Sequence, residues 1–92
     1  MSDWFVYIVR CADDTLYTGV STDVGRRVAE HNAGAPAGAR YTRGRRPVVL
    51  AYAEIASSRS LALRREREIK ALDRTAKLAL IVDPPPALMP PG

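Results

Sequence analysis

The chain is poor in cysteine, histidine and lysine, and these shortages remove several classes of function. Its one cysteine, Cys11, can form neither an internal disulfide nor a cysteine zinc cluster, and it fits a reducing compartment. No apolar stretch approaches the ~18 to 20 residues that cross a bilayer, and the N-terminus lacks a basic region followed by an apolar signal core. Neither a glycine-rich phosphate loop nor a serine, histidine and aspartate triad is found. We therefore expect a cytoplasmic protein without a membrane segment, P-loop or triad.

Arginine, by contrast, is abundant. The 92 residues suffice for one compact domain and carry 14 basic against 10 acidic residues, a net charge of +4. Twelve of the 14 basic residues are arginine. Because the guanidinium group makes planar, bidentate contacts with phosphate, this composition favours a nucleic-acid partner. Whether the protein binds nucleic acid must be judged from where the arginines lie in the sequence.

The order of apolar and polar segments predicts an α+β domain. Residues 4–10 are apolar at both parities, as in a strand buried on both faces, so this strand should be central. Turn residues at 12–14 predict a hairpin to the next strand. The whole chain gives the order β-β-α-β-α-α, with a small antiparallel or mixed three-stranded sheet flanked by helices. The other expected strands are 16–20 and 48–55, and the expected helices run from Thr22 or Asp23 to Gly34, from Ser57 or Ser58 to about Leu72, and over 75–82.

The domain should occupy residues 1–83. Residues 84–92 include five prolines, cannot form a regular backbone ladder, and are predicted to be a disordered tail. The stretch before Pro47 is small and basic without apolar periodicity, and is predicted to be a surface loop.

Arg27 and His31 are candidates for phosphate chemistry. They lie four residues apart, ~40° around the first helix, at the edge of the face that carries Val24 and Val28. An arginine fork can bind a phosphate whose negative charge grows in the transition state, and a histidine can transfer a proton. A solvated helix face with a histidine near its end explains the same pattern, and the pattern alone leaves both interpretations open.

Glu66 is the acid of the second long helix that borders its apolar face. Ala62 and Ile69 fall within ~60° of it, whereas Glu68 is rotated ~160° away. A carboxylate at the rim of a core needs a partner, either a divalent metal or a basic side chain. An ion pair with Lys70, four residues on, is the simpler alternative.

Two tyrosines complete the candidate site, although each alone is typical of a core aromatic. If Tyr7 and Tyr17 share a face of the hairpin, the strands must pair so that, for example, Val9 lies opposite Tyr17. A tyrosine with an ordinary pKa of ~10 can take a proton from water at neutral pH only with help from a cation or metal-bound water.

The loop before the third strand is dense in arginine and has one aromatic residue. This composition suits phosphate contact and base stacking, although solvated loop charge is a competing interpretation. The candidate nucleic-acid-binding residues are Arg40, Tyr41, Arg43, Arg45, Arg46 and, on the second long helix, Lys70.

These motifs, in this order, resemble the GIY-YIG endonuclease superfamily, and specifically its small standalone bacterial members. Val6-Tyr7-Ile8 stands in the place of the first motif and Tyr17-Thr18-Gly19 in that of the second. Three further parts of the pattern then follow in order: the segment 22–32 with Arg27 and His31, the loop 39–43 running into Arg46-Pro47-Val48, and Glu66 before Ile69-Lys70. The resemblance covers about residues 4 to 80.

The resemblance implies a metal-dependent endonuclease that leaves a 5′-phosphate and a 3′-hydroxyl. In this interpretation Glu66 binds a single Mg²⁺ or Mn²⁺ ion and Arg27 stabilises the pentavalent phosphorane. Tyr7 is the leading candidate for activating water, with Tyr17 and His31 assisting. One carboxylate with waters and a substrate oxygen is a reasonable set of ligands for a hard cation.

The resemblance also implies a nucleic-acid substrate, with DNA favoured over RNA, in repair, recombination or processing. Larger relatives carry separate DNA-binding domains. Here affinity must come from the basic loop, from a homodimer or from a partner protein. A catalytically silent nucleic-acid-binding module and a small interaction protein are the competing hypotheses, and neither requires the joint presence of the tyrosines, Arg27, His31 and Glu66.

Overall fold

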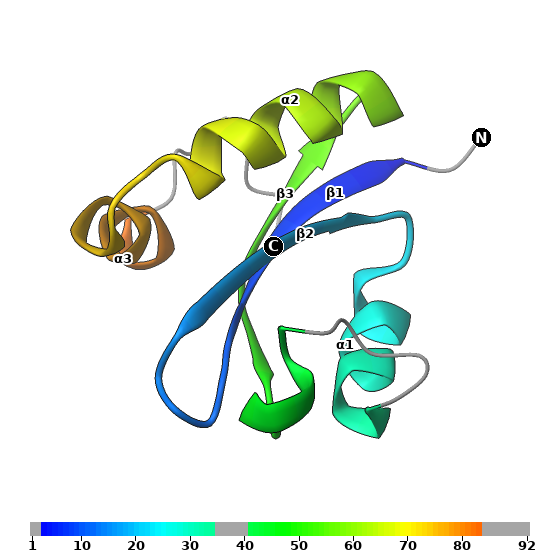
Figure 1. Cartoon of the computed structure of the whole chain (residues 1–92). Helices are drawn as coiled ribbons and strands as arrows, with labels where there is room; N and C mark the ends of the chain where they lie inside the picture. The colour runs from blue at the N-terminus through cyan, green and yellow to red at the C-terminus, as the bar shows by residue number, and fades with distance from the viewer. Residues whose placement is uncertain (1–2, 35–40, 84–92) are drawn as a thin grey trace.

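The computed structural model describes residues 3–34 and 41–83 of the chain. Figure 1 shows the expected α+β architecture, in which helices flank a three-stranded sheet. The elements are β1 (Trp4–Arg10), β2 (Leu16–Ser21), α1 (Val24–Ala33), the short 3-10 helix η1 (Arg43–Arg45), β3 (Val49–Ala56), α2 (Arg59–Lys70) and α3 (Arg74–Val82). The predicted order β-β-α-β-α-α is confirmed. Arg40 and the Pro-rich tail 84–92 lie outside the described residues.

The sheet is fully antiparallel, with β1 in the centre as its two-sided apolar pattern predicts. Val9 lies opposite Tyr17, so the predicted hairpin register is confirmed and Tyr7 and Tyr17 share one face. The turn between β1 and β2 closes with hydrogen bonds from Cys11 N to Thr15 O and from Asp14 N to Cys11 O. Asp14 has φ 66°, a left-handed conformation that aspartate tolerates better than most residues.

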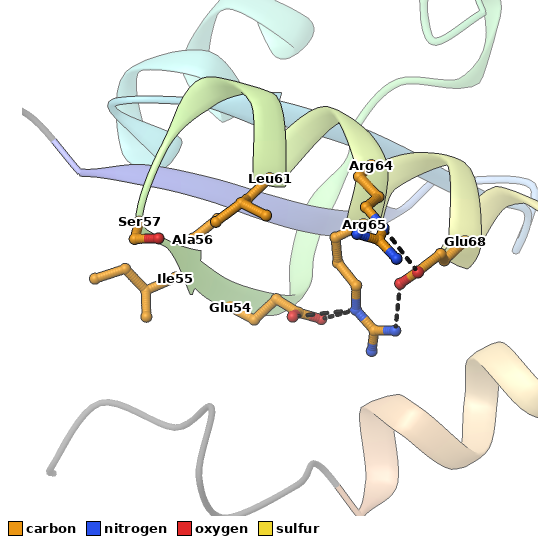
Figure 2. A pocket seen from close by; sticks show the side chains of 8 residues that line it. All are labelled: Glu54, Ile55, Ala56, Ser57, Leu61, Arg64, Arg65 and Glu68. Atoms are coloured by element: carbon orange, nitrogen blue, oxygen red, sulfur yellow. Dashed lines mark hydrogen bonds and ion pairs between the residues drawn. The ribbon is translucent and has the colours of Figure 1, made fainter.

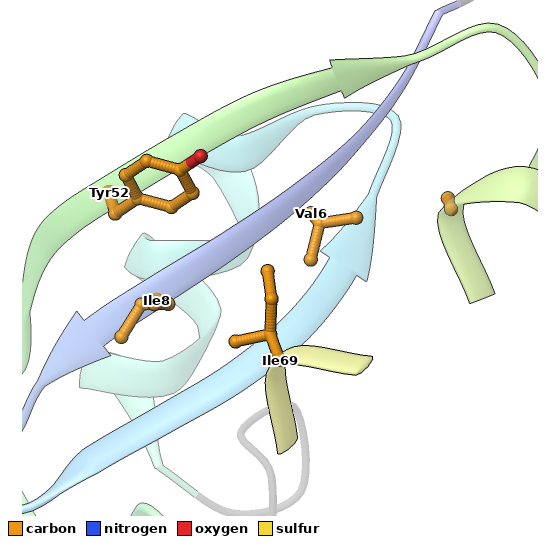
Figure 3. Close-up of a cluster of buried hydrophobic side chains, with 5 residues drawn as sticks. Val6, Ile8, Tyr52 and Ile69 are labelled. Atoms are coloured by element: carbon orange, nitrogen blue, oxygen red, sulfur yellow. The ribbon is translucent and has the colours of Figure 1, made fainter. Parts of the chain in front are cut away.

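The two faces of the sheet carry separate cores. On the α2 side, Val6 and Ile8 of β1 pack with Tyr52 of β3 and with Ala62 and Ile69 of α2 (Figure 3). On the α1 side, the buried cluster consists of Tyr7, Val9, Cys11 and Val48. Cys11 therefore packs at the end of a strand. Because alternate residues of β1 enter different cores, the sheet itself separates Tyr7 from the packing of α2.

The observed N-caps show which of the two candidate capping residues begins α1 and which begins α2. Asp23, rather than Thr22, accepts a hydrogen bond from Arg26 N at 3.1 Å, and Ser58 accepts one from Leu61 N at 3.2 Å. Asp73 caps α3 by accepting from Ala76 N at 2.8 Å. These caps satisfy amide groups that a helix start leaves without partners. Among the described residues, no helix is long and apolar enough to cross a bilayer.

Residues 41–48 are more ordered than the predicted surface loop. The Asn32 side chain binds both backbone groups of Val48, donating to its carbonyl at 3.0 Å and accepting from its amide at 2.7 Å. Ala12 N donates to Arg45 O at 2.8 Å, and η1 forms between these attachments. Long-range side-chain and backbone bonds, which sequence periodicity does not register, therefore hold this segment against α1 and the hairpin turn.

Candidate active site

The Tyr7 ring lies across Gly19 of the neighbouring strand. The two residues are opposite one another in the register, and a Cβ built at Gly19 would meet Tyr7 Oη at 2.6 Å and Cζ at 2.7 Å. Real Cβ atoms do not approach other atoms so closely, so only glycine leaves room for the buried ring. The Tyr17-Thr18-Gly19 motif therefore provides the space in which Tyr7 sits, and the ring points over β2, the outer strand.

Gly19→Ala should lower the free energy of unfolding by ~1–3 kcal/mol, because the added methyl group forces the buried Tyr7 ring or the β2 backbone to move. Denaturant unfolding followed by circular dichroism measures the change. Gly44→Ala is the matched control, since a Cβ there meets nothing within 4 Å, and its effect should stay within ~0.5 kcal/mol. Equal losses in the two variants would show that Tyr7 does not depend on this space.

His31 links Tyr7 to the segment that follows α1. Its Nε2 lies 2.8 Å from Tyr7 Oη, and its Nδ1 lies 2.9 Å from Thr42 Oγ1. The ring is fully buried. Burial, and next the positive charge of Arg27, lower the pKa of His31 below its usual value of 6.5. The imidazole is therefore neutral at neutral pH and one of its nitrogens can accept a proton.

The Tyr7 hydroxyl is surrounded by charge of both signs. Burial, and next the neighbouring Tyr17, raise the pKa of Tyr7 to about 12. The charge and hydrogen bond of Arg27 act in the opposite direction, and the negative charge of Glu66 raises the pKa further. Tyr7 therefore keeps its proton at neutral pH. The charge of Arg27 on α1 and that of Glu66 on α2 therefore act on this hydroxyl in opposite directions.

Arg27 extends from the buried hydroxyl to the surface. Its Nη1 donates to Glu30 Oε1 at 2.9 Å, and Glu30 also pairs with Arg26 at 3.2 Å. The hydrogen bond from Arg27 is the main cause that lowers the pKa of Glu30. A surface hollow of about 220 Å³ is lined by Ser21, Thr22, Asp23, Arg26, Arg27 and Glu30. The Arg27 side chain thus joins an accessible hollow to Tyr7.

Glu66 borders the apolar face of α2, as its position around the helix predicted. Its side chain is 17% exposed, against 52% for Glu68, and the neighbouring residues Ala62 and Ile69 are buried. Glu66 Oε2 also pairs with Lys70 Nζ at 3.4 Å, so the simpler alternative is observed as well. Because the Lys70 side chain is half exposed, the pair contributes only ~0–1 kcal/mol, which leaves the carboxylate available to a stronger partner.

The donor set fits a metal held by one carboxylate. Among residues 3–34 and 41–83, no group of three or more histidine, cysteine, aspartate or glutamate side chains could hold an ion. Mg²⁺ commonly binds one or two carboxylates and completes its shell with waters and substrate phosphates. Glu66 as the one carboxylate is compatible with that mode and not with an all-protein cage.

Aromatic rings extend the cluster away from His31. The Tyr17 ring meets the His31 ring edge-on, with centroids 5.4 Å apart, and stacks on Tyr41 at 5.5 Å. The guanidinium group of Arg45 lies over the Tyr41 ring at 4.1 Å and also binds Asp13 at 3.0 Å. Tyr41 and Arg45 are therefore built into the fold beside the candidate site.

The other arginines of the loop are placed differently. Arg46 donates to the carbonyl of Arg43 at 2.9 Å, and Arg43 is exposed. The structure thus brings together Tyr7, Tyr17, Arg27 and His31, and it places Tyr41 and Arg45 next to them. Glu66 is near enough for its charge to raise the pKa of Tyr7. Lys70 joins through Glu66.

Three residues near this cluster were missed by the sequence analysis. The Gly19 requirement follows from the register, since glycine stands opposite Tyr7, and could have been deduced. Thr42 and Glu30 carry no local signal, because a buried threonine 11 residues from His31 and an acid beside an arginine look ordinary in sequence.

A hollow of about 350 Å³ lies elsewhere, beside β3 and α2 (Figure 2). Glu54, which is 4% exposed, accepts hydrogen bonds there from Arg65 Nε and Tyr52 Oη at 3.0 and 2.9 Å. Arg65 also reaches Glu68 at 3.4 Å. Because the buried carboxylate is satisfied by these partners, we interpret this cluster as structural.

The fold and the cluster of tyrosines, arginine, histidine and glutamate define a nuclease-type domain, and comparison with known families agrees. The GIY-YIG catalytic domain matches residues 3–79. The chain belongs to the GIY-YIG superfamily, a nuclease superfamily that acts on nucleic acid.

Similar proteins carry the family name UPF0213. The chain is 58% identical over 78 residues to a UPF0213 protein of Desulfotalea psychrophila, covering 85% of this chain and 70% of that protein. It is 55% identical over 82 residues to one of Natronomonas pharaonis, covering 89% and 94%. The solution structure of a UPF0213 protein from Bacillus halodurans is similar, with 40% identity, a TM-score of 0.56 and coverage of 92% and 89%.

Proposed function

We propose that this protein is a metal-dependent endonuclease that hydrolyses phosphodiester bonds in DNA, in repair, recombination or processing. The observation that carries the proposal is the buried 2.8 Å hydrogen bond between Tyr7 and His31, at a hydroxyl on which the charges of Arg27 and Glu66 act in opposite directions. Packing alone does not require such a cluster, because burying polar groups and charges costs free energy unless they are paired.

Tyr7 and His31 form a proton path. The Tyr7 hydroxyl accepts a proton from the attacking water as its own proton passes to His31 Nε2. This transfer requires the tautomer in which Nδ1 carries the proton and donates to Thr42 Oγ1. The lowered pKa of His31 leaves the ring neutral and able to accept, and the raised pKa of Tyr7 keeps the hydroxyl protonated until the transfer.

Arg27 acts on the phosphate. The hydroxide formed from water adds to phosphorus, the bond to the 3′-oxygen breaks, and that oxygen takes a proton from solvent, which leaves a 5′-phosphate and a 3′-hydroxyl. The Arg27 fork donates to the non-bridging oxygens as their charge grows, and to do so it exchanges Glu30 for the phosphate. Glu66 would hold Mg²⁺ or Mn²⁺, which supplies Lewis-acid polarisation of the phosphate when bound.

A catalytically silent nucleic-acid-binding module is the second candidate. It is favoured by the two ion pairs that neutralise the proposed groups, Arg27 with Glu30 and Glu66 with Lys70. Phosphate binding alone, however, gives no role to the buried Tyr7–His31 bond.

The buried, free Cys11 supports a reducing compartment such as the cytoplasm.

A cleavage assay with the full chain tests the proposal. End-labelled single-stranded, duplex and branched DNA and RNA are incubated with Mg²⁺ or Mn²⁺, and in parallel with EDTA. We expect cleavage with either ion, complete loss of cleavage with EDTA, and products that carry a 5′-phosphate. Binding to these substrates without cleavage of any of them would favour the silent module.

A further inference from the structure

A basic hollow of about 210 Å³ lies beside the aromatic end of the candidate site. Its lining comes from the hairpin turn, the segment after α1, and α3, and consists of Thr15, Leu16, Tyr41, Arg74 and Lys77. No acidic side chain is among these residues. The catalytic proposal uses neither cation, so both need a different explanation.

The hollow is connected to the candidate site through contacts between aromatic rings. Tyr41 lines it, and the step from Tyr41 to Tyr17 is 5.5 Å and from Tyr17 to His31 is 5.4 Å between centroids. At ~3.4 Å per nucleotide along one strand, two such steps correspond to about three nucleotides or fewer. A strand whose scissile phosphate lies at Arg27 can therefore reach the hollow.

Two groups of the protein already pack against the Tyr41 ring. Tyr17 stacks on the ring and the Arg45 guanidinium group lies over it at 4.1 Å. The side chain remains 39% exposed. Because two groups already pack against the ring, its phenolic hydroxyl is the group available to a ligand, and a hydroxyl donates well to a phosphate oxygen.

The two cations lie close together on α3, and only Arg74 has an acidic partner among the described residues. Arg74 and Lys77 are three residues apart on α3, so their charges repel, and both lie in its first half, near the positive end of the helix dipole. Arg74 is held by Asp14 at 3.1 Å. Lys77 is half-buried and makes no ion pair with any of the described residues. A bound phosphate would relieve the repulsion and use the helix dipole.

We propose that Tyr41, Arg74 and Lys77 bind a phosphate of the substrate strand within a few nucleotides of the scissile bond. This inference rests on the proposed function and assigns α3 a role in substrate binding. It gives this domain a second point of attachment to the substrate strand. It also sets a minimum substrate length, because the strand must extend from Arg27 to α3.

The test compares Lys77→Gln with Arg64→Gln. Arg64 is an equally charged residue on α2, and its side chain is 72% exposed beside the other hollow. Both changes are made in a Glu66→Gln background, so that binding is measured without cleavage. Affinity for a labelled oligonucleotide is measured over a range of salt concentrations. Lys77→Gln should reduce the slope of log K against log salt by ~0.7–0.9, the value for one lost phosphate contact, and Arg64→Gln should leave it unchanged.

An unchanged slope for Lys77→Gln, with the melting temperature retained, would overturn the subsite. Shortening the oligonucleotide on the side that reaches α3 should abolish the difference between Lys77→Gln and its parent. The subsite would also be overturned if Lys77→Gln still weakened the binding of the shortened strand. The same holds if Lys77→Gln changed only the competition by inorganic phosphate and not the binding of the oligonucleotide. If Lys77→Gln shows the predicted change of slope but the protein with Glu66 intact never cleaves, the result would instead count against the catalytic proposal and leave the subsite supported.

Discussion

Glu66→Gln should slow cleavage by at least about a hundredfold while the fold and substrate binding persist. Glutamine keeps the size and hydrogen-bonding capacity of the side chain but removes the charge that holds a divalent ion. The ion pair with Lys70 is partly exposed, so its loss should cost at most ~1 kcal/mol of stability. Single-turnover cleavage, substrate affinity and thermal unfolding are measured on the same preparation.

Glu68→Gln is the matched control for this change. Glu68 lies on the same helix two residues on, is 52% exposed and pairs with Arg64 and Arg65. Its removal should leave the cleavage rate within about twofold of the parent, because it faces away from Tyr7. If Glu66→Gln cleaved as fast as Glu68→Gln with Mg²⁺ or Mn²⁺ supplied, Glu66 would not be the metal-binding residue and the site would need to be reassigned.

Arg27→Ala should raise the barrier of the chemical step by ~3 kcal/mol, a loss of more than about a hundredfold in kcat. The reason is that donors aimed at a phosphate contribute most when its charge is greatest, in the transition state. The pKa of His31 should rise in the same variant, because the positive charge of Arg27 helps to lower it. Single-turnover rates and an NMR titration of the only histidine measure the two effects separately.

Arg26→Ala is the control from the same helix. Arg26 is 77% exposed and shares Glu30 with Arg27, and its own hydrogen bond runs to Glu30 at 3.2 Å. Its loss should change substrate affinity slightly and kcat hardly at all. Comparable losses of kcat in the two variants would mean that the charge of the helix, rather than a positioned guanidinium group, supports the reaction.

The elements and the hairpin register could be predicted because their signals are local. The two-sided apolar run of β1 places it in the centre, and the alternation of side chains fixes Val9 opposite Tyr17 once the tyrosines share a face. The orientation of Glu66 toward the core similarly follows from its angle to Ala62 and Ile69 on an ideal helix.

The order of the 41–48 segment could not be predicted, since its stabilising contacts join residues far apart in the chain. Asn32 binds Val48, 16 residues on, and Arg45 binds Asp13, 32 residues away. Nothing in a run of glycine, arginine and threonine indicates such partners. For the same reason the sequence predicts only that Arg45 is a candidate phosphate contact in a surface loop, whereas the structure shows its guanidinium group engaged by Asp13, the Tyr41 carbonyl and the Tyr41 ring.

The buried carboxylate on β3 has a consequence for how this strand finds its place. From Val49 to Ala56, Glu54 is the only charged side chain, and the remaining residues are apolar or aromatic on both faces. A slip of one residue against β1 would turn every side chain to the opposite face, and Tyr52 would leave the cluster that it forms with Val6 and Ile8. Glu54 would turn away from Arg65 of α2 at the same time and lie on the α1 side, accompanied by Tyr52 from its own strand. The ion pair between Glu54 and Arg65 and the burial of Tyr52 thus together mark the correct alignment of the strand.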